Sequence, residues 1–432
     1  MAVIERSSCV ITAFNSRGVG ISNIGSESPE LIEVPYTIPG EVVEFEKHIY
    51  RDKSSFTLSK VLHKSHNRIV PPCKYFTICG GCSLQHLDYS YYNQIKLDNL
   101  QHILKTHDLV YNTISPIKSI GANSRRRAVF EAVKKQDRLF LGFKKFHSNQ
   151  IVNIDNCLLL LPELSNLIVK LKSLLEKFLI DKEKCKILIT RADNGIDLTI
   201  ETTNNNTTSS DSTEILKDFA INNNIIRLTI INNIKWNLIH LAEKPHVLFD
   251  DVAVEIDNHS FLQVSKSSDT ILAELINNIL GKIRVTEQSL QIADLFCGRG
   301  TLTIPATKFG IVDGFETEHT SVKALTKAIK NAALRAAVYQ RDLFTKPLEW
   351  DELNKYDVVI INPPRAGAKE QAKLLSTSTA RTVIYLSCNP ESFARDAKLI
   401  LHTNRYQLKE ITPIDQFYWS HHIELLGVFE LV

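Results

Sequence analysis

The sequence predicts a multidomain α/β protein: a small β-barrel first, an α+β region next, and a mostly parallel sheet with crossover helices last. Three observations support this prediction. Short alternating segments fill positions 1–62, a tight group of cysteines opens the middle region, and strand and helix signals alternate from position 246 onwards. A chain of 432 residues is long enough for two or three domains, each with its own core. We therefore expect domains at 1–62, 63–245 and 246–432.

The first domain is predicted as a barrel of short strands. Alternating segments run from Ser8 to Phe14, from Glu41 to Phe45 and from Phe56 to Val61, with turn formers such as Pro39-Gly40 between them. The Pro-Gly-Glu turn followed by Val-Val-Glu-Phe resembles the TRAM domain, an OB-like RNA-binding barrel. A β-appendage without a binding role is the alternative interpretation of this segment.

The middle region carries a cysteine pattern typical of a metal site. Cys73, Cys79 and Cys82 form C-x5-C-G-G-C, and Cys157 follows much later in the same region. The two glycines let the backbone approach closely and point amide N–H groups inward, where they can hydrogen-bond the sulfurs of an iron–sulfur cluster. Structural zinc sites usually show two tight cysteine pairs, whereas this pattern has one, so an iron–sulfur cluster is favoured over zinc.

A nucleoside-binding crevice is predicted early in the third region. A strand from Ile292 to Phe296 is followed by a turn at 297–300 and by a helix that begins at Thr301. Glu316 ends the strand that comes after Gly298, where a carboxylate can accept hydrogen bonds from ribose hydroxyls. The third glycine of a dinucleotide fingerprint is missing, so Asp-Leu-Phe-Cys-Gly-Arg-Gly-Thr favours S-adenosylmethionine over NAD. Acids stand at three successive strand ends: Asp294, Glu316 and Asp342.

The fourth strand of this region ends in Asn362-Pro363-Pro364-Arg365. The two prolines fix the backbone as it leaves the sheet, so that a polar side chain and carbonyl groups face the reacting centre. Methyltransferases that act on exocyclic amino groups carry an aromatic residue after Asn-Pro-Pro, and Arg365 stands there instead. RNA cytosine-5 enzymes carry a cysteine after the proline of this motif, and no cysteine occupies that place.

A thiol and a carboxylate in the last quarter of the chain indicate the chemistry. Ile384 to Ser387 is predicted as a buried strand, and Cys388 follows it, at the strand end where open α/β sheets react with ligands. Glu424 supplies a carboxylate at the start of the final strand. Carbon 5 of a pyrimidine becomes nucleophilic only after a group adds to carbon 6, and thiolates add well near neutral pH. A thiolate, a carboxylate base and a methyl donor therefore point to carbon-5 methylation of a pyrimidine.

These motifs together resemble the RNA 5-methyluridine (uracil-5) methyltransferase family, in its branch with a TRAM domain and a four-iron four-sulfur cluster. The resemblance covers nearly the whole chain and is greatest to the 23S ribosomal RNA enzymes. It implies a Rossmann-like S-adenosylmethionine domain, with Cys388 as the nucleophile and Glu424 as the base that removes the carbon-5 proton. The cofactor pocket that it implies is lined by Gln263, Phe296, Gly298, Thr301, Glu316, Asp342 and Asn362. The cluster that it implies is bound by Cys73, Cys79, Cys82 and Cys157.

Three positions depart from the family pattern. Asn362 stands where Asp is usual, so the acceptor oxygen is kept but the negative charge that would favour a cationic sulfonium is lost. Thr301 and Ser265 stand where Asn is usual. None of these changes removes the nucleophile or the base. Asn362 nevertheless leaves open a non-catalytic RNA-binding or ribosome-assembly protein with a degenerate methyltransferase domain, and transfer RNA is the alternative substrate to ribosomal RNA.

Charge and hydropathy bear on the partners. The net charge of +3 favours nucleic acid only weakly, but basic residues gather at Arg125-Arg126-Arg127, Lys134-Lys135 and Lys144-Lys145. We expect RNA to contact the surface around the arginine triplet and the barrel. No stretch has the roughly 18 uncharged apolar residues of a membrane span, and no secretory signal is apparent. A cytoplasmic location is therefore expected, and the chain is also expected to be a monomer.

Overall fold

The chain packs into two units in this computed structural model, which describes residues 3–25, 30–50, 53–146, 148–203, 210–233, 235–283 and 289–432. The N-terminal unit comprises Met1–His102, Lys144–Val152 and Phe417–His422. The main unit comprises Ile103–Phe143, Asn153–Gln416 and Ile423–Val432. The division into three domains stays a prediction.

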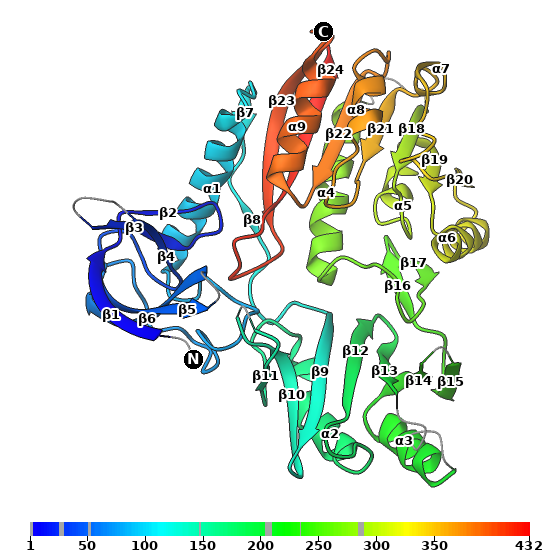
Figure 1. Cartoon of the computed structure of the whole chain (residues 1–432). Helices are drawn as coiled ribbons and strands as arrows, with labels where there is room; N and C mark the ends of the chain where they lie inside the picture. Colours follow the sequence, from blue (N-terminus) through cyan, green and yellow to red (C-terminus); the bar gives the residue numbers. More distant parts are fainter. Residues whose placement is uncertain are drawn as a thin grey trace. The chain divides into compact units, whose positions relative to one another are not determined.

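The N-terminal unit is built on two small antiparallel sheets (Figure 1). The first has the order β1 (Val3–Val10), β5 (Val42–Tyr50) and β6 (Lys53–His63), and the second has the order β2 (Ala13–Phe14), β3 (Gly20–Ile24) and β4 (Glu30–Val34). Their inward side chains form one core of Ile11, Ile32, Val34, Val43 and Phe45. Helix α1 (Tyr89–Thr106) follows, with its last turn in the main unit. The predicted run of short strands is confirmed.

A sheet of seven strands in the order β11-β10-β9-β12-β13-β14-β15 belongs mostly to the main unit, whereas Lys144 of β10 and Ile151 and Val152 of β11 are assigned to the N-terminal unit. Their bounds are β9 (Arg127–Lys135), β10 (Arg138–Lys144), β11 (Ile151–Asn153), β12 (Lys184–Ala192), β13 (Gly195–Thr202), β14 (Ile225–Asn232) and β15 (Lys235–Leu241). The main unit also contains helices α2 (Pro162–Leu175) and α3 (Ser210–Asn222) and the hairpin of β16 (His246–Phe249) and β17 (Val252–Glu255). Helix α2 is amphipathic as its sequence predicts, because its buried residues recur at helical spacing.

The last part of the main unit is a mixed nine-stranded sheet in the order β20-β19-β18-β21-β22-β24-β23-β7, with β8 also paired to β23. The strands are β7 (Thr113–Ile114), β8 (Lys118–Ser119), β18 (Leu290–Leu295), β19 (Gly310–Glu316), β20 (Ala336–Gln340), β21 (Val358–Ile361), β22 (Thr382–Ser387), β23 (Tyr406–Asp415) and β24 (Glu424–Leu431). The helices are α4 (Lys266–Ile283), α5 (Thr303–Ala306), α6 (His319–Asn331), α7 (Trp350–Leu353), α8 (Lys369–Leu375) and α9 (Pro390–Leu401).

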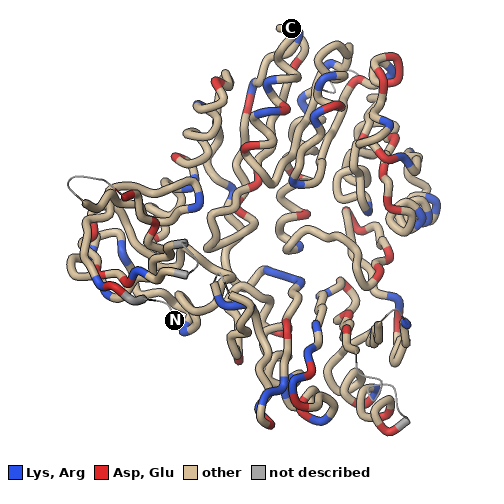
Figure 2. The backbone as a smooth tube through the Cα atoms, viewed as in Figure 1, with Lys and Arg blue, Asp and Glu red and all other residues tan. Residues whose placement is uncertain are grey.

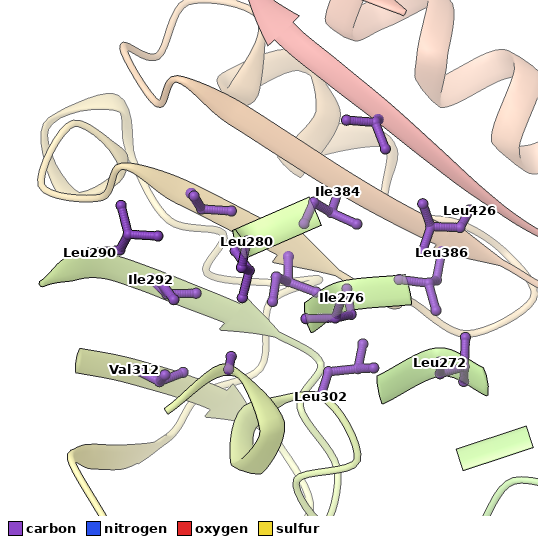
Figure 3. Packing of buried hydrophobic residues seen from close by; sticks show 14 of the residues in the cluster. Leu272, Ile276, Leu280, Leu290, Ile292, Leu302, Val312, Ile384, Leu386 and Leu426 are labelled. Atoms are coloured by element: carbon purple, nitrogen blue, oxygen red, sulfur yellow. The ribbon is translucent and has the colours of Figure 1, made fainter. Parts of the chain in front are cut away.

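The central strands of this sheet are parallel, and their side chains are buried on both faces. Strands β18 to β22 pair in parallel, and β21 and β22 read as continuous apolar runs, as parallel strands covered on both faces do. Figure 3 shows Leu272, Ile276 and Leu280 of α4 against apolar side chains of the strands, in one buried cluster. Strand β24 runs antiparallel to β22, so its first residue lies at the edge where the parallel strands end. Ligands of open α/β sheets bind at that edge.

In the part of the chain that the structure describes, no helix is both long enough and apolar enough to cross a membrane.

Candidate active site

A tight turn follows β18 at the carboxyl edge of the sheet. Gly298 and Gly300 have φ of +55° and +92°, and Phe296 also has a positive φ, of +61°. A non-glycine residue in this conformation costs about 1–3 kcal/mol, and such residues concentrate at functional sites. A Cβ on Gly300 would lie 2.5 Å from a methyl group of Leu325, so helix α6 leaves no room for a side chain there. The positive φ therefore favours glycine at both positions, and the contact with Leu325 excludes a side chain at Gly300 as well.

Glu316 holds this turn to the end of β19. Its carboxylate accepts hydrogen bonds from the N–H groups of Gly298 (3.0 Å), Thr317 (2.8 Å) and Glu318 (2.9 Å). The side chain is half-buried. The predicted pairing of a glycine turn with an acid at the end of the next strand is thus found in the geometry, and Glu316 lies at the position where open sheets bind a ribose.

Asp294, near the end of β18, holds the helix that follows the same turn. It is fully buried, and Thr303 donates a hydrogen bond of 2.6 Å to its Oδ2. Burial raises the pKa of Asp294 to about 7, and the neighbouring charge of Glu316 acts in the same direction, against the hydrogen bond from Thr303. No described residue bonds its Oδ1. The buried carboxylate therefore anchors α5 to the end of β18.

Asp342 and Asn362, two more of the predicted cofactor residues, follow strands β20 and β21 at the same edge of the sheet. Asp342 accepts hydrogen bonds from the Phe344 N–H and the Thr345 hydroxyl, each at 3.0 Å, and the Phe344 ring lies 5.4 Å from that of Phe296. The Asn362 N–H donates to the carbonyl of Leu295 at 3.2 Å, which ties the loop after β21 to the end of β18.

Thr301 follows the glycine turn directly and is half-buried, and Gln263 is buried with 4% of its surface exposed. The backbone carbonyl of Gln263 accepts a hydrogen bond of 3.1 Å from Arg126.

The arginine triplet is not the open basic surface that its sequence suggests. Arg126 is 2% exposed, and its Nη2 lies 2.8 Å from Asp269 on α4. Arg127 donates to the carbonyl of Ser260 at 2.8 Å and is partly buried. Arg125 alone is exposed. The prediction of an RNA-binding surface at all three arginines is wrong for Arg126, because this side chain is buried and its charge is paired with Asp269 of α4.

Cys388 and Glu424 meet at the edge of the sheet through strand register. Ser387 at the end of β22 pairs with Leu425 of β24, so the next step of the ladder sets Cys388 against Glu424. Cys388 is half-buried and Glu424 is 2% exposed. Burial raises the pKa of the Cys388 thiol, and the carboxylate of Glu424 raises it further, whereas the guanidinium of Arg365 lowers it. The two predicted residues therefore act on each other electrostatically.

The Glu424 carboxyl is buried and accepts a hydrogen bond from a residue that follows β23. Burial raises its pKa to about 7. Gln416, directly after β23, donates a hydrogen bond from its Nε2 to Glu424 Oε2. Sequence reasoning did not find Gln416 or the role of Arg365 near the thiol. The signal for Gln416 is the pairing of Ile414 with Glu424 between β23 and β24, which an alternating pattern does not specify.

The predicted cluster cysteines are divided between the two units. Cys73, Cys79 and Cys82 belong to the N-terminal unit and Cys157 to the main unit. Among the described residues, no group of three or more His, Cys, Asp or Glu side chains lies close enough together to hold a metal ion. A Cβ on Gly80 would lie 3.1 Å from the carbonyl oxygen of Lys144, so the glycine after Cys79 is required by close backbone packing. The cluster stays a prediction.

Comparison with known proteins places the chain in a family. A sequence profile of the tRNA (uracil-5-)-methyltransferase family matches residues 88–430. An uncharacterized RNA methyltransferase of Mesorhizobium japonicum is 31% identical, over 97% of this chain and 97% of its own. The 23S rRNA (uracil(1939)-C(5))-methyltransferase of Francisella tularensis is 28% identical, over 98% of this chain and 96% of its own.

A solved structure shows the same fold. The tRNA (uracil-54, C5)-methyltransferase of Pyrococcus abyssi, in complex with S-adenosyl-L-homocysteine, superposes with a TM-score of 0.71 at 22% identity. The match covers 98% of this chain and all of the other chain. The chain therefore belongs to the RNA uracil-5 methyltransferase family, and S-adenosylmethionine-dependent methylation of carbon 5 of uracil in RNA is its reaction.

Proposed function

We propose that this enzyme methylates a specific uridine of 23S ribosomal RNA, with Cys388 as the nucleophile and Glu424 as the base. The observation that carries the assignment is the ladder register between β22 and β24, which brings the thiol and the carboxylate to one edge of the sheet. The glycine turn after β18 lies at that edge, where a nucleoside cofactor is expected. S-adenosylmethionine supplies an electrophilic methyl group there.

The reaction follows from the chemistry of these two side chains. The target uridine leaves the base stack so that its ring faces become accessible. The Cys388 thiolate adds to carbon 6, and the electron pair that moves to carbon 5 attacks the methyl group, so that S-adenosylhomocysteine leaves. Glu424 then removes the proton from carbon 5, the bond between carbon 6 and sulfur breaks, and the thiolate is restored.

The electrostatics of the pair support these roles. A general base works best when its pKa lies near the working pH, and burial raises the pKa of Glu424 to about 7. The raised pKa of the Cys388 thiol keeps it protonated until the pH rises or a positive charge approaches. Arg365 is the cation already acting on the thiol.

Two variants separate the roles. Cys388→Ala is expected to abolish methylation while S-adenosylmethionine binding, measured by calorimetry, stays within about twofold. Glu424→Gln should still methylate carbon 5 but fail to release the RNA, so a covalent adduct should survive denaturing electrophoresis. Absence of that adduct in a variant that still binds RNA would remove Glu424 from the role of base.

The cofactor pocket is proposed from the residues around the glycine turn. Glu316 would accept the ribose hydroxyls, and Asp342 and the Phe296 ring would flank the adenine. Gly298 would let the backbone pass close to the cofactor, and Thr301 would offer its backbone N–H to the amino-acid part. Gln263 and Asn362 would complete the pocket beside the methyl group. The positive φ values in the turn support this site, because they let backbone N–H groups turn towards a ligand.

Two RNA classes compete as substrate. The 28% identity to a named 23S ribosomal RNA enzyme, over nearly full length, supports ribosomal RNA. Transfer RNA is the second candidate, supported by the match of residues 88–430 to the tRNA (uracil-5-)-methyltransferase family. The Pyrococcus enzyme has the same fold over its whole chain, so the N-terminal strands do not separate the two classes. Incubation with tritium-methyl S-adenosylmethionine and either unmodified RNA, followed by nucleoside analysis, decides between them. Label in transfer RNA alone would overturn the ribosomal assignment.

A four-iron four-sulfur cluster on Cys73, Cys79, Cys82 and Cys157 is part of the proposal. Four thiols are the donor set that such clusters require, and the tight packing of Gly80 supports a shaped binding loop. The cluster would shape an RNA-binding surface and take no part in methyl transfer. Iron and sulfide should be present in anaerobically purified protein and lost in Cys79→Ser, but kept in Cys185→Ser, because Cys185 is a buried core residue of β12. Zinc in place of iron would contradict the assignment.

RNA contacts are proposed at the end of the seven-stranded sheet as well as at Arg125 and the barrel. Figure 2 shows Lys and Arg, with Asp and Glu between them, where the β9–β10 hairpin meets the start of β12. Four exposed cations lie there: Lys135, Arg138, Lys182 and Lys184. Strand pairing and the hydrogen bond from the Lys182 N–H to the Lys134 carbonyl bring these segments together. Phosphate groups would pair with them. As expected from the sequence, the enzyme would act as a cytoplasmic monomer.

A further inference from the structure

Hydrogen bonds between side chains of helix α9 and the backbone hold the loop that follows β21. The loop spans residues 362–368 and carries Asn362 and Arg365. The side chain of Arg395 donates to the carbonyl of Ala366 at 2.8 Å, and Asp396 Oδ2 accepts from the N–H of Ala368 at 2.7 Å. Two consecutive residues of α9 therefore bind the loop backbone, one at a carbonyl group and the other at an N–H group.

The Asp396 carboxylate is buried, and both of its oxygens accept hydrogen bonds. Asp396 is 0% exposed, and besides Ala368 it accepts from the Tyr385 hydroxyl at 2.6 Å and from Arg395 Nε at 2.8 Å. Tyr385 lies on β22, the strand that leads into Cys388. A Cβ on Gly367 would lie 2.4 Å from Asp396 Oδ2, so the loop comes as close to the carboxylate as a glycine allows.

The same helix carries the turn of the nucleophile. Asn389 follows Cys388 and caps α9, with its side chain accepting from the N–H of Glu391 at 3.3 Å. The Asn389 Nδ2 donates to the carbonyl of Arg365 at 3.3 Å. The Cys388 turn and the Arg365 loop are thus joined directly by Asn389 and, further along the helix, by Asp396.

We propose that Asp396, with Tyr385 and Arg395, is a positioning device that fixes the 362–368 loop so that the Arg365 guanidinium stays beside the Cys388 sulfur. Asp396 itself touches no reacting atom. The inference rests on the proposed function, because it takes Cys388 as the nucleophile. The charged groups that act on the thiol are Glu424 from β24 and Arg365 from this loop. If the fastening is released, the stabilisation of the thiolate by Arg365 is lost while the repulsion from Glu424 remains.

The test measures the thiol without RNA or S-adenosylmethionine, so its failure is distinct from failure of the proposed reaction. The full-length protein is treated with iodoacetamide across a pH series, and alkylation of the Cys388 peptide is followed by mass spectrometry. Arg365→Gln should raise the midpoint by about half a pH unit or more, because a cation near a thiol favours its charged form. Arg365→Lys should keep the midpoint close to that of the native chain.

Asp396→Asn gives the decisive result. Removal of a negative charge would by itself lower the midpoint, whereas release of the loop raises it, so the two explanations differ in sign. The positioning role predicts a rise for Asp396→Asn and no further rise in the double variant Asp396→Asn/Arg365→Gln, because both changes remove one interaction. An unchanged or lowered midpoint in folded Asp396→Asn, or additive shifts in the double variant, would overturn it.

Two tyrosines provide a matched pair in case Asp396→Asn does not fold. Tyr385→Phe removes only the hydroxyl that donates to Asp396 and should raise the midpoint in the same direction. Tyr406→Phe removes another buried hydroxyl, which bonds Ser378 at 2.8 Å and the carbonyl of Ala380 at 2.7 Å, outside the loop. Tyr406→Phe should leave the midpoint unchanged. Equal shifts in both variants would reduce the effect to general loosening of the sheet and refute the positioning role.

Discussion

Glu424 makes the stability of the protein depend on pH through a single side chain. Its pKa rises from 4.5 to about 7 because it is buried. The folded state disfavours the charged form, so the protein loses stability as the pH rises from about 4.5 to about 7, and the loss is constant above that window. At about 1.36 kcal/mol per unit, the full effect is about 3 kcal/mol.

The variant Glu424→Gln removes this titration and should therefore be more stable than the native chain at high pH. Its advantage in the free energy of unfolding should grow by about 3 kcal/mol between about pH 4.5 and pH 8, measured by urea denaturation in parallel series. Asp294 is present in both proteins and cancels in the difference. A constant difference across the series would show that folding does not raise the pKa of Glu424.

Asn362 follows β21 and stands where the family resemblance leads us to expect Asp. Asn362→Asp restores a negative charge beside the expected sulfonium, and opposite charges attract strongly in a partly buried site. The variant should bind S-adenosylmethionine several-fold more tightly and S-adenosylhomocysteine, which lacks the positive charge on sulfur, with little change. Calorimetry with both ligands tests this. Equal gains for both ligands would point to a general change in the pocket.

At the scale of the element, the turn after β18 offers a matched pair of glycines. Gly298 has φ of +55° with nothing within 4 Å of an added Cβ, whereas Gly300 has φ of +92° and a Leu325 methyl group 2.5 Å away. Both alanine variants pay the left-handed backbone cost of about 1–2 kcal/mol, but Gly300→Ala also displaces α6. Gly300→Ala should therefore lower the melting temperature and weaken cofactor binding more than Gly298→Ala. The reverse order would mean that the turn is held by other contacts.

A buried ion pair joins the segment before β9 to α4. Arg126 and Asp269 have side chains only 3% and 7% exposed, and breaking a buried pair by removing one partner costs about 3–5 kcal/mol. Arg126→Gln should unfold at markedly lower urea concentration, while exposed Arg125→Gln should change stability by less than about 0.5 kcal/mol. Similar stabilities for the two variants would restore the interpretation of Arg126 as a surface residue.

At the scale of the whole molecule, the residues that sequence reasoning placed correctly are those with local signals. Glycines after a strand, an acid after the next strand and a cysteine at a strand end follow from periodicity and turn chemistry, and they meet because parallel strands end at one edge. Gln416 and Asp396 were missed because their partners depend on strand register and on helix contacts across the fold. The very short strands β7 and β8 were missed because such segments have no period.

Misplacement of the arginine triplet has the same origin. Three adjacent arginines signal a basic surface in sequence, but Arg125 and Arg126 precede β9, where no periodic pattern tells which side chain is buried. Only tertiary structure separates the exposed Arg125 from the buried Arg126. The exposed cations at the end of the seven-stranded sheet thereby become the basic group to test first for RNA contact.

The combined variant Lys135→Gln, Arg138→Gln, Lys182→Gln and Lys184→Gln tests that surface. If these cations neutralise phosphates, RNA affinity should fall, and the slope of log affinity against log salt should become shallower by up to about 3, because each phosphate contact on single-stranded RNA contributes about 0.7. Cofactor binding and alkylation of Cys388 should be unchanged, since none of the four residues lies at the carboxyl edge of the nine-stranded sheet, where Cys388 and the glycine turn lie. Lys323→Gln with Lys330→Gln on α6 removes charge from another surface and serves as the control. The control removes two charges against four, so a loss of affinity about half as large in the control would reduce the effect to net charge. A shallower slope only in the first variant would establish that RNA extends along this sheet.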